Sequence, residues 1–198
     1  MPSFLDHVED LLSVLRWVLG ETGTPPLLVG HSLGGSVSLV ASARQPDAVA
    51  GLLVFEAPLL WEPWWPRPQD EPTTLSPTEL EDSAERFMRR IVGDAIWEAL
   101  PERTKEQRRA EGPVLEAELR TARMMRPPDL SLISAPVIVA TGSEVPDQRR
   151  RAIASILAAI PSAESAVLTG APHNAHTARP EGFAGLIEAL GRRVDEFG

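Results

Sequence analysis

Five consecutive residues near position 30 have the pattern of an activated serine. They are Gly30, His31, Ser32, Leu33 and Gly34, with the spacing G-x-S-x-G between an apolar run and a predicted helix. In such a setting a sharp turn exposes the serine hydroxyl, and the start of the helix favours developing negative charge. Glycines two residues before and after Ser32 are expected to prevent clashes where strand and helix cross. The sequence therefore predicts Ser32 as a nucleophile, with the Leu33 N–H as one oxyanion donor.

The simpler alternative is that Ser32 only caps a helix. We disfavour it because a strand pattern precedes the serine, and Gly35 and further small residues follow. The rest of the chain supplies elements that could position such a turn. Strands are predicted at 27–29, 49–55, 136–141 and 165–169, and helices at 3–19, 33–44, 152–160 and 180–194. This alternation predicts an α/β fold, with a mostly parallel sheet flanked by helices. The wholly apolar run at 27–29 suits a strand buried on both faces.

The pattern changes between residues 59 and 132. A segment rich in proline and tryptophan, WEPWWPRPQDEP, excludes regular helix and central strand because proline lacks an N–H donor. Helices follow near 77–92, 94–100, 101–111 and 113–125. We expect an all-helical cap at 61–130, inserted between two strands of a core formed by 1–60 and 131–198. Five side chains could line an apolar pocket or simply pack the cap, namely Trp61, Trp64, Trp65, Met124 and Met125.

Composition excludes several other kinds of function. The net charge of −9 disfavours nucleic-acid binding, and we interpret the arginines at 108–109 and 149–151 as solvated helix faces. Without cysteine there is no disulfide framework and no thiol nucleophile. No cofactor motif is evident, and the three-residue spacing of His173 and His176 lacks a third metal ligand. With neither a leader nor an apolar run of membrane-spanning length, we expect a soluble cytoplasmic protein that does not bind membranes.

Two blocks of the sequence resemble the α/β-hydrolase superfamily. The central block of that family, with the nucleophile elbow (the strand–turn–helix that presents the serine), resembles LLVGHSLGGSVSLVASARQPDAVAGLLVFE. Its C-terminal block, which delivers the catalytic histidine, resembles TGAPHNAHTARPEGFAGLIEAL. The resemblance implies His173 as the general base, although Pro172 stands where the family usually has a second glycine. His176 resembles a second histidine that faces the cap, and it is the alternative base.

The third member of a catalytic triad is less clearly marked. The usual acid of the family follows the strand predicted at 136–141, but Val145 occupies that position. Glu144 and Asp147 flank it and stay open as alternatives. Some branches of the superfamily place the acid after the preceding strand, where this sequence has Glu56 in VFEAP. We expect Glu56, because the base needs a carboxylate to accept its second N–H and Glu56 follows a rigid strand.

The resemblance also implies that several strands precede the first helix of this chain. The expected architecture is therefore a partial α/β-hydrolase fold, in which the second oxyanion donor cannot be named. A longer natural chain is the explanation we favour, beside a natural remnant or a chain completed by another polypeptide. The strand at 27–29 would otherwise form an exposed apolar edge, through which the protein could associate with itself.

These residues together point to acyl-transfer chemistry. The resemblance implies a hydrolase acting on carboxylic esters, thioesters or lactones, with a Ser-His-acid triad and an acyl-enzyme intermediate. The fold alone does not settle the reaction, since lyases and haloperoxidase-like members share the same elbow. The alternatives are a truncated non-catalytic remnant and a member of the superfamily that binds a small ligand.

Overall fold

The structure, a computed structural model, describes residues 2–67 and 75–197. It separates into two compact units. The α/β unit comprises Leu5–Trp65 and Arg126–Gly198, and the helical unit comprises Met1–Phe4 and Pro66–Met125. The proline- and tryptophan-rich segment extends beyond residue 67, so its last part lies outside the described residues.

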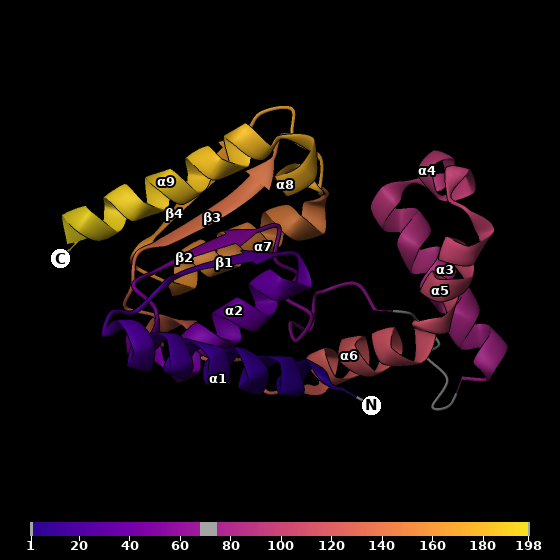
Figure 1. Ribbon diagram of the computed structural model, residues 1–198, viewed down its shortest axis with the longest axis horizontal. Coiled ribbons are helices and arrows are strands. Elements are labelled where there is room, and N and C mark those ends of the chain that lie inside the picture. Colours follow the sequence, from indigo (N-terminus) through magenta and orange to yellow (C-terminus); the bar gives the residue numbers. More distant parts are fainter. Residues whose placement is uncertain (1, 68–74, 198) are drawn as a thin grey trace. The chain divides into compact units, whose positions relative to one another are not determined.

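The α/β unit is built on a sheet of four parallel strands. They lie side by side in chain order: β1 (Leu27–His31), β2 (Gly51–Phe55), β3 (Val137–Gly142) and β4 (Ala163–Leu168). On one face lie α1 (Phe4–Thr22), α2 (Leu33–Arg44) and α7 (Asp147–Ala159), and on the other lies α9 (Pro180–Phe197) (Figure 1). Three short elements complete the unit, namely η1 (Pro46–Ala48), η2 (Leu130–Leu132) and α8 (Ala175–Ala178). The predicted class, a mostly parallel sheet flanked by helices, is confirmed.

The core of this unit is formed by the two central strands. Every residue of β2 and β3 is buried, because each strand has a neighbour on both sides and helices cover both faces. Side chains alternate between the faces, so Leu53 and Phe55 point the same way, where they pack with Phe183 and Leu190 of α9. The ends of β2 and β3 are thereby held rigidly.

Strand β1 differs from the prediction. Its expected burial on both faces is wrong, since Leu27 is 38% exposed and Val29 is 37% exposed. The physical reason is its place at the edge of the sheet, where β2 is its neighbour among the described strands. Apolar side chains at this edge are therefore exposed to water, whereas those of the central strands are buried.

The helical unit contains α3 (Pro77–Val92), α4 (Asp94–Ala99), α5 (Glu102–Ala110) and α6 (Gly112–Met124). These bounds agree with the predicted helices to within a residue. Helix α3 begins with a capping box, in which the Ser76 side chain accepts from the Glu79 N–H and the Glu79 carboxylate accepts from the Ser76 N–H. The role of this unit as a cap stays a prediction.

Candidate active site

Ser32 occupies a strained turn between β1 and α2. Its backbone has φ 53° and ψ −127°, a conformation that costs a non-glycine residue about 1–3 kcal/mol. Two sets of hydrogen bonds hold it there. The Ser32 N–H donates to the Phe55 carbonyl at 2.9 Å, and the Ser32 carbonyl accepts from the Gly35 N–H at 2.8 Å. The serine side chain is thus fixed at the carboxyl end of the sheet, where open α/β sheets bind their ligands.

The glycines around Ser32 act differently from the prediction. A Cβ atom on Gly30 would lie 2.6 Å from the Gly35 Cα, so this glycine is needed where β1 meets α2. A Cβ atom on Gly34 would meet nothing within 4 Å, so its predicted steric role is wrong. Gly35 carries that role instead, because its Cβ would lie 2.8 Å from the Ala57 side chain.

Three side chains form a continuous hydrogen-bonded row. The Ser32 hydroxyl lies 3.1 Å from Nε2 of His173, and Nδ1 of His173 lies 2.6 Å from Oε2 of Glu56. An ionised carboxylate only accepts, so Nδ1 carries the imidazole proton and Nε2 is free to accept from the serine. The arrangement has the order and contacts of a nucleophile, a base and an orienting acid.

Glu56 is buried at the end of β2 and surrounded by donors. Its side chain is 2% exposed, and its backbone has a positive φ of 51°. The Thr141 hydroxyl and the Gly142 N–H each donate to Oε1 at 3.2 Å. Arg149 and His173 each donate to Oε2 at 2.6 Å. Burial acts to raise the pKa of Glu56, but the bonds from His173 and Gly142 and the charge of Arg149 together hold it below its ordinary value.

The other acids that the sequence left open lie elsewhere. Glu144 is exposed, and Asp147 forms an ion pair with Arg150 at the surface. His176 also lies outside the row, with its ring centroid 4.7 Å from that of His31. The geometry thus groups Glu56 and His173 with Ser32.

His31, the variable residue of the serine pattern, supports the loop that carries His173. Its Nε2–H donates to the His173 carbonyl at 2.7 Å, and the two rings lie 4.7 Å apart. Burial lowers the pKa of His31, against the raising effect of that hydrogen bond, and the nearby His173 and His176 lower it further. A neutral imidazole is therefore favoured at this place.

Sequence reasoning missed three groups that hold Glu56. The interpretation of residues 149–151 as a solvated helix face is wrong for Arg149, which binds the buried carboxylate. Nothing in a run of three arginines distinguishes the one that points inward. Thr141 ends a predicted strand and Gly142 follows it, and parallel pairing of that strand with β2 was the signal that could have placed both near Glu56.

The remaining predicted side chains have simpler surroundings. Leu33 is the first residue of α2, so its N–H precedes the hydrogen bonds of the helix and can face an oxyanion. Trp61 is buried. The Trp64 ring lies 6.0 Å from that of Trp65 and takes the guanidinium of Arg151 on its face at 4.4 Å. Trp61 and Trp64 thus pack within the α/β unit.

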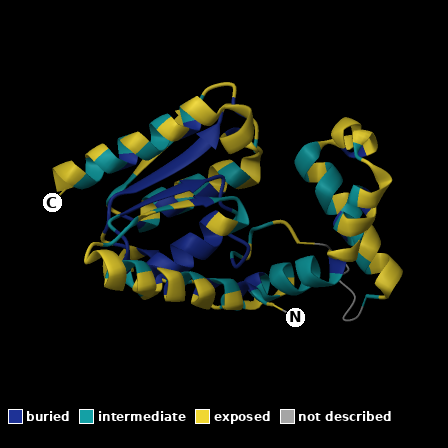
Figure 2. Ribbon diagram, viewed as in Figure 1, coloured by how far each residue is buried: buried dark blue, intermediate teal, exposed yellow. Residues whose placement is uncertain are grey.

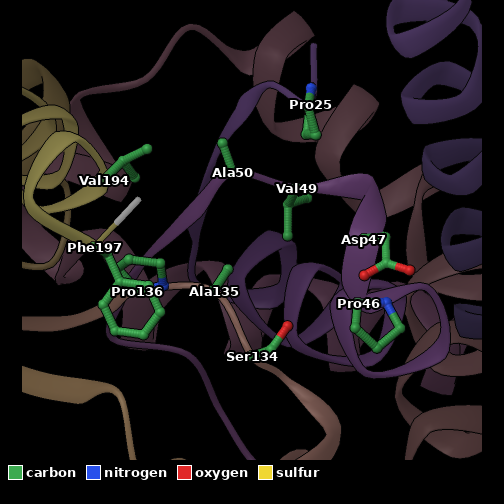
Figure 3. A pocket seen from close by; sticks show the side chains of 10 residues that line it. All are labelled: Pro25, Pro46, Asp47, Val49, Ala50, Ser134, Ala135, Pro136, Val194 and Phe197. Atoms are coloured by element: carbon green, nitrogen blue, oxygen red, sulfur yellow. The ribbon is translucent and has the colours of Figure 1, made fainter.

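A hollow of about 480 Å³ lies at the opposite end of the sheet (Figure 3). Its walls come from segments that precede β1, β2 and β3 and from the end of α9, so it does not adjoin the Ser32 row. It is lined by Pro25, Pro46, Asp47, Val49, Ala50, Ser134, Ala135, Pro136, Val194 and Phe197.

Two structural features bear on other classes of function. Within residues 2–67 and 75–197, the side chains of histidine, aspartate and glutamate form no group of three that could hold a metal ion. No helix of the described chain combines the length and apolar character needed to cross a membrane.

Solved structures with a similar backbone are numerous. A carboxylesterase structure from the thaumarchaeon Nitrososphaera gargenis is 21% identical with a TM-score of 0.58, over 96% of this chain and 73% of that one. An esterase from Thermogutta terrifontis is 21% identical with a TM-score of 0.61, over 98% and 74% of the two chains. The peroxisomal α/β-hydrolase Lpx1 from Saccharomyces cerevisiae is 15% identical with a TM-score of 0.63, over 100% of this chain and 60% of that one. At such identities the likeness shows the fold.

The comparison with families is more direct. No curated protein sequence matches the chain. A family model described as alpha/beta hydrolase family matches residues 2–186, which include Ser32, Glu56 and His173. The chain therefore belongs to the alpha/beta hydrolase family.

Proposed function

We propose that this protein is a serine hydrolase that cleaves carboxylic esters or related acyl compounds through an acyl-enzyme. The observation that carries the proposal is the row from Ser32 through His173 to Glu56, with bonds of 3.1 Å and 2.6 Å. In the family the same order of nucleophile, acid and base along the chain accompanies this chemistry.

Each residue has a defined part in the proposed reaction. Ser32 Oγ bonds to the acyl carbon as its proton passes to Nε2 of His173, and the Leu33 N–H stabilises the resulting oxyanion. The bond to the leaving oxygen then breaks, and His173 returns the proton to that oxygen. Water, with His173 again as base, attacks the acyl-enzyme and releases the carboxylic acid and free Ser32. Glu56 stabilises the imidazolium in both halves.

The substrate class rests on the kind of chemistry and on the solved relatives. Those relatives include the two esterases above and Est816, an N-acyl homoserine lactone degrading enzyme, at 18% identity with a TM-score of 0.61. They support an ester or lactone and leave its acyl group open. A putative non-heme bromoperoxidase from Mycobacterium tuberculosis, with a TM-score of 0.61, has the same fold.

A fluorophosphonate tests the proposal without a known substrate, because it phosphonylates an activated serine and displaces fluoride. We expect intact-mass analysis to show one adduct on the protein and none on Ser32→Ala. Ser13→Ala, which changes an exposed serine of α1, is the matched control and should label normally. A folded protein without an adduct would contradict the proposal and favour the non-catalytic alternative.

Paired variants test the assignment of base and acid. His173→Gln should abolish labelling, whereas His176→Gln should retain it. Glu56→Gln should slow labelling by about 10³–10⁴, in line with the loss of a triad acid. Glu144→Gln and Asp147→Asn should change the rate little. The assignment of Glu56 is wrong if either of these two variants shows the large loss and Glu56→Gln does not.

A further inference from the structure

Arg149 binds the same carboxylate oxygen as the base. Its guanidinium donates from Nη1 to Oε2 of Glu56 at 2.6 Å, and Nδ1 of His173 lies 2.6 Å from that oxygen. The Arg149 side chain is 22% exposed and its partner 2% exposed, so the ion pair is largely shielded from solvent. Charged groups this close in a shielded place interact far more strongly than they would in water.

The two following arginines have other partners. Arg150 pairs with Asp147 at the surface, and its side chain is 63% exposed. The Arg151 guanidinium lies over the ring of Trp64. Of the three consecutive arginines in α7, Arg149 is the one that contacts Glu56, so its neighbour Arg150 offers a matched control of the same chemistry.

The contacts around Glu56 fix the orientation of its carboxylate. Thr141 and Gly142 hold Oε1, and Arg149 holds Oε2 from the side of α7. With both oxygens held, the carboxylate plane cannot rotate, and Oε2 stays directed at Nδ1 of His173. Residues that act in this way set the geometry of the groups that touch the substrate.

The charge of Arg149 has a second effect. The guanidinium keeps Glu56 ionised, but it also places a fixed positive charge near the imidazole of His173. That charge repels an imidazolium at His173, so its removal is expected to make protonation of the ring easier. The other titratable groups around His173 are Glu56 itself on β2, His31 on β1 and His176 on α8, whose ring lies beside that of His31.

We propose that Arg149 is a positioning residue of the site, which orients Glu56 toward His173, keeps Glu56 ionised and places a positive charge that opposes formation of the imidazolium. The inference rests on the proposed function, because it assigns His173 the role of base. A purely structural alternative is that Arg149 only fastens α7 to the sheet.

The main experiment compares the pH dependence of fluorophosphonate labelling between variants. Arg149→Met keeps the aliphatic stem and removes the charge. We expect the labelling rate at its pH-independent plateau to fall about 10–100-fold. We also expect the acidic limb of the profile, where labelling declines as the pH falls, to move upward by about one pH unit. Arg149→Lys retains the charge, so its limb should stay in place while part of the rate is recovered. Arg150→Met should match the parent protein in both respects.

A second measurement separates this inference from the proposed function. In Ser32→Ala protein, which cannot be labelled, the ring signals of His173 are followed by NMR as the pH is changed. We expect the midpoint of that titration to rise when Arg149→Met is added, and to stay when Arg150→Met is added. If the parent protein is never labelled but this midpoint rises, the proposed function fails and the electrostatic role of Arg149 stands.

Other results would overturn the inference. In Arg149→Met, the acidic limb and the NMR midpoint could both stay in place while labelling falls only as folded protein is lost. That result would mean that Arg149 only fastens α7 to the sheet. Should Arg149→Met not fold, Arg149→Gln supplies a second neutral side chain, and the same two measurements decide with that variant.

Discussion

The two units of the chain are stabilised by different means. The α/β unit buries every residue of β2 and β3, and Figure 2 shows this as a continuous buried centre. Each helix of the helical unit is largely half-buried or exposed, and α3 buries Ala84 alone of its described residues. Apolar burial holds the first unit, which makes it sensitive to added volume.

The helical unit is organised around one tryptophan and a network of charges. Trp97 is fully buried, and the guanidiniums of Arg89 and Arg109 lie 5.7 Å and 5.9 Å from its ring. Both arginines donate to the Glu85 carboxylate, at 2.8 Å and 2.7 Å. Charges in such a network respond to salt and pH, so the two units should fail under different conditions.

The sharpest test of close packing in the α/β unit is Gly30→Val. The new side chain would collide with the backbone at Gly35 and with the hydroxyl of Ser38, each 2.6 Å from a Cβ at this position. We expect this variant not to form a folded α/β unit and to lose labelling at Ser32. Gly34→Ala is its control, since a Cβ there meets nothing within 4 Å, and it should fold and be labelled. Circular dichroism and intact mass check both.

The matching test in the helical unit is Trp97→Ala. Removal of a fully buried tryptophan should cost about 3–5 kcal/mol of local stability. Hydrogen exchange followed by mass spectrometry should show faster exchange in peptides from 77–124, with little change in peptides from β2 and β3. Trp17→Ala serves as control, because Trp17 is 66% exposed on α1 and its loss should be nearly neutral. Equal acceleration in both units would contradict the separation between them.

A smaller effect is expected from Glu85→Gln. Hydrogen bonds from Arg109 and Arg89 lower the pKa of Glu85. A carboxylate whose pKa is depressed in the folded state stabilises the fold at any pH above its unfolded-state pKa, which is near 4.5. This contribution is lost as the pH falls through the folded-state pKa. The parent helical unit should thus lose protection from hydrogen exchange as the pH falls below 4.5, and Glu85→Gln should lose less.

The same variant also tests the role of salt. At neutral pH and low ionic strength, Glu85→Gln should exchange faster than the parent protein in α3 and α5, and 1 M salt should reduce the difference. Glu106→Gln, at an exposed position of α5, should behave like the parent protein. A Glu85 effect that is independent of both salt and pH would mean that packing rather than charge holds this unit.

The smallest effect on stability is expected at the sheet edge. Self-association through β1 stays a prediction, and Val29→Lys tests it by placing a charge on an exposed apolar edge. We expect sedimentation velocity to show less association at high concentration, with little change in melting temperature. Val14→Lys changes an exposed valine of α1 and should leave association as in the parent protein. Equal behaviour of the two variants would argue against the edge.

Much of the fold could be predicted because local pattern and burial coincide. The four strands, the helices of the helical unit and the turn at Ser32 follow directly from apolar periodicity, prolines and glycines. Helix α7 was predicted to start at 152, yet it starts at Asp147. Its first turn is polar and carries no apolar repeat, so periodicity alone places the start too late.

The site was predictable only where a single element determines it. Glu56 was favoured because it follows a buried strand, and the structure places it against His173. The roles of Gly35 and Arg149 were missed because each depends on the residue that it contacts. Gly35 packs against Ala57, and Arg149 of α7 binds the carboxylate of Glu56. Such contacts join segments far apart in the chain, and no local pattern records them.

The insertion of the helical unit between β2 and β3 has a consequence for folding kinetics. Contacts between Glu56 and Gly142 span 86 residues, and those between Ser32 and His173 span 141. Closing loops of this length costs chain entropy before any contact compensates for it. During synthesis, Ser32 and Glu56 leave the ribosome well before His173, so the row of three side chains must wait for a distant partner. The site is therefore expected to be among the last parts of the protein to form.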